Sequence, residues 1–374
     1  VGGGRDAFIG GVHRIAARLD DHYALLAGAF SSTPEKALAS ADDLGIDPSR
    51  AYSDYTKMAE EESAREDGIE AVSIVTPNHL HYSVAREFLS RGIHVICDKP
   101  LTATLDDAKA LRSLADQSDA LFVLTHNYTG YPMIRQARSM VSDGKLGEIR
   151  VIQVEYPQDW LSTKLEDSGQ KQAGWRTDPG QSGLGGCIGD IGTHAFNLAA
   201  FVTGLELDCL CADIQTFVDG RALDDNAHVL LRYQGGARGM LWSSQVAPGN
   251  ENALRLRVYG SEGGLEWSQE DPNYLWHTPL GEPKRLLTRG GSGANDAANA
   301  VTRIPGGHPE GYLEGFANIY SDAAKAIVQK RTAVSASSEY LYPDVLDGLL
   351  GVAFVSAVVH SAKEGGVWKT LDLD

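Results

Sequence analysis

Apolar and polar positions alternate between two periods along the first third of the chain. Short apolar runs at residues 71–76, 94–97 and 121–125 are typical of buried strands. Between these runs, residues 79–91 and 105–117 repeat apolar positions at helical spacing. Buried strands that are separated by single helices predict a parallel sheet with helices on both faces.

Two further segments belong to this first region. An apolar run over residues 23–30 predicts a strand, and residues 33–44 predict a helix with Thr33 as its cap and Pro34 at its first position. We expect the helix over residues 79–91 to stop at Gly92.

The pattern changes after about residue 130, where short strand-like runs follow one another. Residues 133–142 predict one more helix, which Gly144 closes. Polar and glycine turns such as Gln234-Gly235-Gly236 separate the later runs, which favours an antiparallel sheet. The predicted strands cover residues 149–156, 207–218, 227–233, 238–245, 254–259 and 264–269.

The last quarter of the chain predicts a loop and two helices. Residues 284–309 are rich in Gly, Asn and Pro, and we expect a long surface loop near the functional site. Helices are predicted near residues 311–329 and 342–363, and both should pack back on the core.

Composition and charge exclude some classes of protein. Hydrophobic residues make up 43% of the 374 positions and charged residues 22%, which favours globular packing over disorder. The net charge of −17 argues against nucleic acid or an anionic membrane as partner. The four scattered cysteines (Cys97, Cys187, Cys209 and Cys211) form no CxxC pair, and we expect free thiols. With no signal peptide and no apolar run of spanning length, a reducing cytoplasm fits best.

The N-terminus carries a glycine-rich turn. A dinucleotide turn needs glycines where the backbone approaches a pyrophosphate, followed by a helix N-terminus. Gly2-x-Gly4 matches the first two positions, but Gly10 lies six positions after Gly4 where the usual pattern allows three. We expect the helix to open at Gly10-Gly11. The chain starts at Val1, directly at the turn, and we expect a first strand to precede it.

The end of the second predicted strand bears on the cofactor. An acid at this position binds the ribose of NAD and repels the extra phosphate of NADP. This chain has Ser31-Ser32-Thr33, with Glu35 and Lys36 further on, so both cofactors stay possible and NAD is slightly favoured.

Three strand ends are unusually polar. They read Thr76-Pro77-Asn78-His79-Leu80-His81, Cys97-Asp98-Lys99-Pro100 and Thr125-His126-Asn127-Tyr128. Ligands of doubly wound sheets lie beyond such carboxyl ends. Pro100 favours an extended Lys99, whose ammonium group could stabilise a developing alkoxide.

A second cluster runs from Gly185 to His194. Asp190 and His194 are four positions apart, so on a helix they share a face. We expect His194 in the first turn of a helix, where the positive end of the dipole keeps its ring neutral and able to accept a proton.

These motifs together resemble the Gfo/Idh/MocA oxidoreductase family. The resemblance covers nearly the whole chain, and it rests on the glycine-rich start, Thr76-Pro77-Asn78-x-x-His81, Asp98-Lys99-Pro100, Trp175-Arg176 and Asp190-x-Gly192-x-His194. It implies an N-terminal Rossmann domain with a doubly wound parallel sheet over residues 1–130. It also implies a substrate-binding and oligomerisation α+β domain over residues 131–374, with a large, mostly antiparallel open sheet and helices on one face. Asp98 departs from the family, which usually has Glu there.

The resemblance also implies roles for individual residues. Lys99, Asp190 and His194 form the catalytic set, with His194 as general base, and the protein is a dimer or tetramer that packs through the C-terminal sheet. The residues expected to bind NAD, or alternatively NADP, are Gly2, Gly4, Phe8, Ile9, Ser31, Ser32, Lys36, Thr76, Pro77, Asn78, His81, Asp98, Lys99, Asn127, Trp175 and Arg176. The residues expected to bind substrate are Lys99, Tyr128, Trp160, Arg176, Asp190 and His194, with Lys164, Trp175, His308 and Tyr312 as further candidates.

The expected reaction is oxidation of a secondary hydroxyl on a sugar, inositol or sugar derivative. His194 removes the hydroxyl proton, Lys99 steadies the oxyanion and Asp190 orients the pair. Arg176 would suit an acidic or sulfonated sugar.

Three alternatives stay open. One is a redox-neutral glycosidase that works through a transient keto-sugar, and another is a regulator that only senses the dinucleotide. The third is a metal hydrolase using His81, His126, Asp190 and His194, which no metal-ligand spacing supports.

Overall fold

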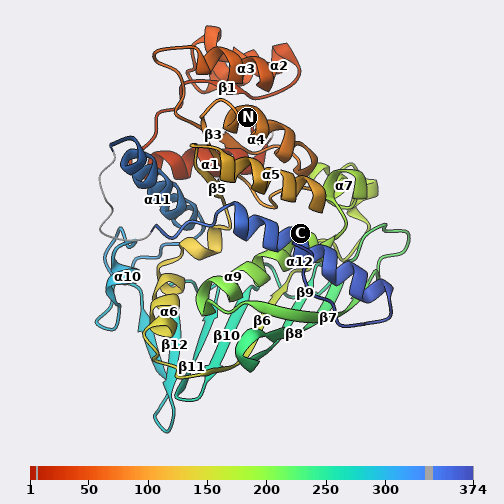
Figure 1. Ribbon diagram of the computed structural model, residues 1–374, viewed down its shortest axis with the longest axis vertical. Helices are drawn as coiled ribbons and strands as arrows, with labels where there is room; N and C mark the ends of the chain where they lie inside the picture. The colour runs from red at the N-terminus through yellow and green to blue at the C-terminus, as the bar shows by residue number, and fades with distance from the viewer. Residues whose placement is uncertain (6, 333–339, 374) are drawn as a thin grey trace. The chain divides into compact units, whose positions relative to one another are not determined.

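The computed structural model describes residues 1–5, 7–332 and 340–373, which divide into two compact units. The first unit comprises Val1–Asn127 and Leu313–Leu349, and the second comprises Tyr128–Tyr312 and Leu350–Asp374. Figure 1 shows the course of the chain.

The first unit is built around parallel strands. β1 (Gly28–Ala29) pairs with β2 (Ala51–Tyr52), and β3 (Ala71–Ile74), β4 (His94–Cys97) and β5 (Phe122–Leu124) form a second set. Its helices are α1 (Phe8–Leu19), α2 (Pro34–Asp43), α3 (Tyr55–Ser63), α4 (His81–Leu89), α5 (Leu105–Gln117) and α11 (Tyr312–Thr332), of which Tyr312 alone belongs to the second unit. Short 3-10 turns lie at Pro48–Arg50 and Asn78–Leu80.

Val1 and Gly2 join the two sets of strands. The Gly2 amide donates to the carbonyl of Ala29 at 2.9 Å, and the Val75 amide donates to the carbonyl of Val1 at 3.0 Å. Gly2 also forms a parallel bridge with Val75. The N-terminal residues therefore occupy the central position between β1 and β3, which gives the predicted doubly wound, Rossmann-like sheet.

Two predicted elements of this unit have different bounds. The strand predicted over residues 23–30 shrinks to β1, because only Gly28 and Ala29 find ladder partners, at Ala51 and Tyr52. α1 begins at Phe8, two residues before the predicted opening at Gly10.

The second unit carries an eight-stranded sheet in the order β13-β12-β11-β10-β6-β9-β8-β7. Pairing is antiparallel except between β6 and β9, which run parallel, so the predicted sheet is mostly antiparallel. The strands are β6 (Ile149–Pro157), β7 (Leu207–Gln215), β8 (Asn226–Tyr233), β9 (Arg238–Ser244), β10 (Arg255–Gly260), β11 (Gly263–Ser268), β12 (Tyr274–Pro279) and β13 (Arg285–Thr288).

One face of this sheet is covered. Alternate residues such as Ile152 and Val154 of β6 point into an apolar core, where α6 (Pro132–Ser142), α9 (Thr193–Thr203) and the later turns of α12 (Val345–Lys363) also contribute side chains. Phe196 of α9 stacks on Phe354 of α12 with ring centroids 4.3 Å apart. Shorter helices lie at α7 (Lys171–Arg176), α8 (Pro179–Ser182) and α10 (Asp296–Asn299), with 3-10 turns at Asn127–Gly130, Leu165–Ser168 and Gln234–Gly236.

The expectation of a long loop over residues 284–309 is wrong. β13 and α10 lie inside this segment, and β12 precedes it as a strand that the pattern did not predict. The buried Arg289 holds the segment in place, because its guanidinium pairs with Glu310 at 2.9 Å and donates to the carbonyl of Ile304 at 2.7 Å.

α12 corrects the statement from the sequence that no apolar run is long enough to span a membrane. Its 19 residues have a mean hydropathy of 1.8 in the best window, long and apolar enough to cross a membrane by length and composition alone. Of that window, 61% is buried inside the protein, which is typical of a core helix.

Candidate active site

The glycine turn of the first unit meets α1 backbone to backbone. A Cβ on Gly10 would overlap the Cα of Gly3, and a Cβ on Gly4 would lie 2.7 Å from the carbonyl oxygen of Phe30. Gly3 also has a φ of +69°, which side-chain-bearing residues rarely adopt. The close pair is thus Gly3 with Gly10, and this contact explains the irregular glycine spacing.

The entrance to α1 is open to a ligand. Among the described residues, Ala7 at the N-cap makes no side-chain cap hydrogen bond, and Phe8 is 69% exposed. A cavity of about 470 Å³ lies over Gly3, Gly4 and Phe8. Uncapped amides at a helix N-terminus are the groups that bind phosphate.

The strand end that bears on cofactor choice is polar and exposed. Thr33 is the N-cap residue of α2 and Pro34 its first helical residue, as predicted, but the Thr33 side chain makes no cap hydrogen bond among the described residues. Ser31 Oγ accepts the amide of Thr33 at 3.1 Å. Ser32 and Lys36 are both exposed.

His81 braces two of the polar strand ends. Its Nδ1 lies 2.7 Å from the carbonyl oxygen of Pro100, and its Nε2 lies 3.0 Å from that of Thr76. The Lys99–Pro100 peptide bond is cis. Burial lowers the pKa of His81, although both carbonyls and Asp98 oppose this. The ring therefore ties the segment that carries Lys99 to the end of β3.

Asp98 is held by neighbours from other elements. Its Oδ1 accepts the hydroxyl of Thr125 at 3.1 Å and lies 3.7 Å from Nε2 of the buried His13, an ion-pair distance. Burial opposes ionisation, but His13, Lys99 and His81 outweigh it and hold the pKa of Asp98 below its usual value. Sequence reasoning missed His13, which lies on α1 far from Asp98 in the chain.

His126 lies beside Lys99 as a neutral ring. Burial, together with the Lys99 charge, lowers the pKa of His126 to about 3. The surroundings of Lys99 thus combine the carboxylate of Asp98 with an uncharged imidazole.

In the second unit, Asp190 and His194 lie on one continuous helix. A π-helical turn, η5 (Ile188–Gly192), runs directly into α9, and its last residue, Gly192, keeps helical backbone angles. His194 is in the first turn of α9, as predicted, but η5 precedes that turn. The expected influence of a free helix N-terminus on His194 is therefore wrong.

Asp224 anchors the start of this helix. Its Oδ1 accepts the amide of Gly186 at 2.6 Å, and its Oδ2 accepts the amide of Ile188 at 2.9 Å and the thiol of Cys187 at 3.0 Å. Burial raises the pKa values of both Asp224 and Cys187. The positive end of the helix is thus satisfied by Asp224, which the sequence did not single out.

The ring of His194 is enclosed by tyrosines. Its centroid lies 4.9 Å from that of Tyr128 and 6.3 Å from that of Tyr156, both at steep angles, and only 7% of His194 is exposed. The two tyrosine hydroxyls are 2.5 Å apart, and Tyr156 donates to Asn252 Oδ1 at 2.7 Å. Burial raises the pKa of Tyr128. Tyr156 and Asn252 were not predicted, because a tyrosine inside a strand pattern resembles a core residue.

Asp190 receives two donors on one oxygen. Arg176 Nε lies 3.2 Å and Gln245 Nε2 lies 3.0 Å from Asp190 Oδ2. The guanidinium also donates to Gln172 and lies 4.3 Å above the ring of Trp175. Arg176 and Asp190 were both predicted for the site, whereas Gln245 was not.

The other substrate candidates of the second unit make contacts of different kinds. Trp160 Nε1 donates to Gln158 Oε1 at 3.0 Å, and Gln158 in turn donates to Asn252 at 2.6 Å. Lys164 pairs with Asp167 at 3.3 Å, and His308 is exposed. Tyr312 is half-buried, and it adds to burial and Tyr128 in raising the pKa of Tyr156. Trp160 therefore connects to the tyrosine pair through Asn252.

No group of three or more metal-ligating side chains is present in the parts of the chain that the structure describes. The four cysteines are free thiols, as predicted.

Two family models match the chain, one in each part. Residues 1–126 match the model described as "Oxidoreductase family, NAD-binding Rossmann fold", and residues 134–266 match the "GFO/IDH/MocA C-terminal domain". An uncharacterized oxidoreductase, YfiI of Bacillus subtilis, is 37% identical over 98% of this chain and 95% of the relative. The chain belongs to the Gfo/Idh/MocA oxidoreductase family.

Solved structures resemble this Gfo/Idh/MocA oxidoreductase along nearly its whole length. An oxidoreductase from Sinorhizobium meliloti is 62% identical, with a TM-score of 0.89 over 97% of both chains. An inositol dehydrogenase homologue from Azotobacter vinelandii, solved with NADH and myo-inositol, is 39% identical, with a TM-score of 0.91 over 98% of this chain and 95% of that one. The chain is therefore an NAD(P)-dependent oxidoreductase.

The first unit of this Gfo/Idh/MocA oxidoreductase suits a dinucleotide. Thr76 Oγ1 and Asn127 Nδ2 are buried without a hydrogen-bond partner among residues 1–5, 7–332 and 340–373. Both residues were predicted to bind the cofactor, and a buried polar atom without a partner costs free energy unless a ligand supplies one. With the open N-terminus of α1, these atoms fit NAD.

Proposed function

We propose that this enzyme oxidises a secondary hydroxyl of a neutral cyclic polyol or sugar. The observation that carries the proposal is the second unit's polar cluster, in which Asp190 and the buried His194 share one helix. The Azotobacter homologue bound to NADH and myo-inositol supports it. Bound NAD supplies the acceptor for the hydride that leaves the substrate carbon. The residues proposed to hold NAD are those predicted from the sequence, led by the turn at Gly2 and Gly4 and by Thr76 and Asn127.

His194 is proposed as the general base. Its ring is enclosed by Tyr128 and Tyr156, so its orientation is fixed before substrate binds. A fixed base in a dry site removes a hydroxyl proton efficiently, which typically contributes about 10²- to 10⁴-fold in rate.

Lys99 is proposed to donate to the substrate oxygen as negative charge develops on it. The neutral His126 beside Lys99 leaves the ammonium charge undiminished, while Asp98 balances part of it. Lys99 and His194 are thus proposed to have complementary roles in the reaction, as donor and base.

Arg176 leads us to favour a neutral substrate. The sequence alone made Arg176 a candidate for binding an acidic or sulfonated sugar. In the structure its charge faces Asp190 at 3.2 Å and stacks on Trp175. The carboxylate of Asp190 offsets the positive charge of the guanidinium, so the pair attracts an anionic substrate only weakly.

The test is turnover of an alcohol panel containing myo-inositol, glucose and levoglucosan, with NAD and separately with NADP. We expect NADH absorbance to rise with a neutral polyol. His194→Ala should lower kcat by about 10²-fold or more, and Lys99→Ala should lower it by about 10²- to 10³-fold. Lys57→Ala, on the exposed face of α3, is the matched control and should keep wild-type rates.

The outcomes separate this function from its alternatives. Near-normal turnover in both Lys99→Ala and His194→Ala would show that the assigned roles are wrong. Cleavage of a glycoside without accumulation of NADH would point to the redox-neutral glycosidase instead.

We also propose that the enzyme assembles as a homodimer or homotetramer through the open face of the eight-stranded sheet, and that it works in the cytoplasm. Leu230 and Met240 are opposite each other on β8 and β9, and both are exposed on the face away from the core. Trp276 and Leu286 form a second exposed pair on β12 and β13. Exposed apolar residues that share one sheet face are typical of a protein interface.

A further inference from the structure

The carboxylate of Asp190 is held by two residues that differ in charge. Arg176, at the end of α7, brings a cation, whereas Gln245, directly after β9, brings a neutral amide. Both donate to Oδ2, at 3.2 Å and 3.0 Å. Gln245 is 3% exposed, so its amide has little access to water as an alternative partner.

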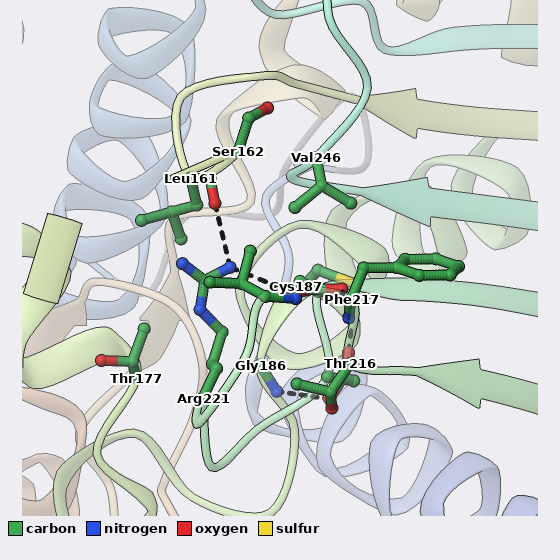
Figure 2. A network of polar contacts seen from close by, with 12 residues as sticks. Leu161, Ser162, Thr177, Gly186, Cys187, Thr216, Phe217, Arg221 and Val246 are labelled. Atoms are coloured by element: carbon green, nitrogen blue, oxygen red, sulfur yellow. Dashed lines mark hydrogen bonds and ion pairs between the residues drawn. The ribbon is translucent and has the colours of Figure 1, made fainter. Parts of the chain in front are cut away.

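The backbone of Gln245 is fixed on both sides. Its amide donates to the carbonyl of Asp225 at 2.9 Å, and its carbonyl accepts the amide of Leu161 at 3.1 Å. Arg221 closes this frame, because its guanidinium donates to the Leu161 carbonyl at 3.0 Å and to Asp225 Oδ2 at 3.2 Å. Figure 2 shows the Arg221 side chain reaching the Leu161 carbonyl. These hydrogen bonds fix the backbone position of Gln245, as expected of a residue that orients another side chain.

Other titratable groups surround Asp190 in the second unit. They include Arg176 on α7, Tyr128 before α6, Tyr156 on β6 and His194 on α9. Burial raises the pKa values of Tyr128 and Tyr156, and the charge of Asp190 adds to both shifts, so this charge acts on the rings that enclose His194. A change in the ionisation of Asp190 would thus change the electrostatic environment of the proposed base and its neighbours.

We propose, on the basis of the proposed function, that Gln245 is a positioning residue that holds Asp190 ionised and oriented for the reaction. Its amide is a donor that only an ionised or accepting oxygen satisfies, so the contact favours the carboxylate form. Arg176 stabilises the negative charge of Asp190, and Gln245, which lies on a different element, fixes the orientation of the carboxylate. Gln245 acts through Asp190 and touches neither hydride nor proton.

Gln245→Glu tests the contact without any substrate. The variant replaces the donor amide with a carboxylate of the same shape, so two carboxylates face each other. We expect its thermal unfolding midpoint to fall by at least about 2 °C. In an Asp190→Asn background the same change should cost nothing, because the amide introduced at position 190 can donate to the new carboxylate. An equal fall in both backgrounds would show that Gln245 does not act on Asp190.

The pH profile tests the functional part. With NAD and myo-inositol, or the first alcohol of the panel that is turned over, kcat/KM should fall at low pH through two protonations, that of the proposed base His194 and that of Asp190. The acid limb due to Asp190, separated by comparison with Asp190→Asn, is the one that Gln245 should control. In Gln245→Glu this acid limb should move up by about 1 pH unit or more, since neighbouring carboxylates resist ionising together. Gln234→Glu adds the same charge in the second unit, at the exposed turn Gln234–Gly236 before β9, and should leave the limb in place.

Different results would contradict the proposed function and the proposed role of Gln245. Wild-type turnover in Asp190→Asn overturns the proposed function. Lost turnover in Asp190→Asn with an unmoved acid limb in Gln245→Glu overturns the role of Gln245 alone. Gln245→Met, which removes only the donor, covers the case in which Gln245→Glu does not fold. An acid limb at its wild-type position in Gln245→Met also contradicts the role.

Discussion

Single side chains set the charge around Lys99. Asp98 stays ionised because His13, Lys99 and His81 together outweigh its burial, whereas the buried His126 stays neutral. Protonating His126 would place a second cation beside Lys99 in a dry environment. The neutral His126 therefore adds no positive charge beside Lys99, and its burial makes the unit sensitive to acid.

Acid should destabilise the protein through His126. Its pKa falls from 6.5 to about 3 on folding, so between these values the unfolded chain binds more protons than the folded one. The contribution of His126 to the free energy of unfolding is thus fully present above about pH 6.5. It is lost as the pH falls toward the folded pKa, with a slope of up to about 1.4 kcal/mol per pH unit. His126→Gln should flatten this dependence, as measured by thermal midpoints from about pH 7 to about pH 4.

His360→Gln is the control for that measurement, because His360 is exposed near the end of α12. Equal acid sensitivity of wild type and His126→Gln would contradict the prediction.

The sequence identified residues that stand out beside a strand or helix end. Lys99 precedes a proline at a strand end, and Asp190 and His194 share a helical spacing. It could not identify Gln245, which lies 55 positions from Asp190 and meets it only when β9 and the helix pack together. Tyr156 and His13 were hidden for the same reason, since a polar contact inside a core leaves no local pattern.

At the scale of elements, the continuous helix of η5 and α9 depends on an anchor from elsewhere. The sequence predicted the helix and the first-turn place of His194. The π-helical turn before it was not predicted, and the carboxylate that accepts the amide at its start belongs to Asp224, 36 positions from Ile188. Likewise β12 and β13 lie next to a Gly- and Pro-rich segment that resembled a loop, and the buried Arg289–Glu310 pair orders it.

Asp224→Asn should loosen the start of this helix. Either orientation of the new amide points its NH₂ group at a backbone donor, Gly186 or Ile188, so at least one buried donor loses its acceptor. We expect a loss of about 1–3 kcal/mol, which corresponds to roughly 2–4 °C in the thermal midpoint per kcal/mol for a unit of this size. Differential scanning calorimetry against the exposed control Asp208→Asn measures it. A midpoint unchanged from that control would argue against the anchor.

At the scale of the molecule, the open sheet face and the net charge act in opposite directions. A charge of −17 keeps copies of the chain apart, whereas the exposed pairs Leu230–Met240 and Trp276–Leu286 favour their contact. The alternation of apolar residues predicted the strands that carry the first pair. It could not show which face stays open, because that depends on where α6, α9 and α12 pack.

Charges on the open face should break the assembly. We expect the wild type to elute as a dimer or tetramer in size-exclusion chromatography with light scattering. Leu230→Glu combined with Met240→Lys should lower the measured mass toward that of one chain, because an interface loses apolar area and buries charge. Leu280→Glu, at a 77% exposed turn outside the strands, is the control. A monomeric wild type would refute the assembly.

The first unit is made of two stretches of chain, and this bears on the order in which the enzyme folds. The ring of His13 packs on Phe316 at 5.1 Å and bonds to the Tyr320 hydroxyl at 2.8 Å, so α1 needs α11 to cover it. A ribosome adds roughly 5–20 residues per second, so α11 emerges on the order of ten seconds or more after α1. During that interval the nascent dinucleotide domain exposes the surface that α11 will cover. Residues 1–130 expressed alone should therefore be prone to aggregation, and chaperone dependence should end only once synthesis has passed α11.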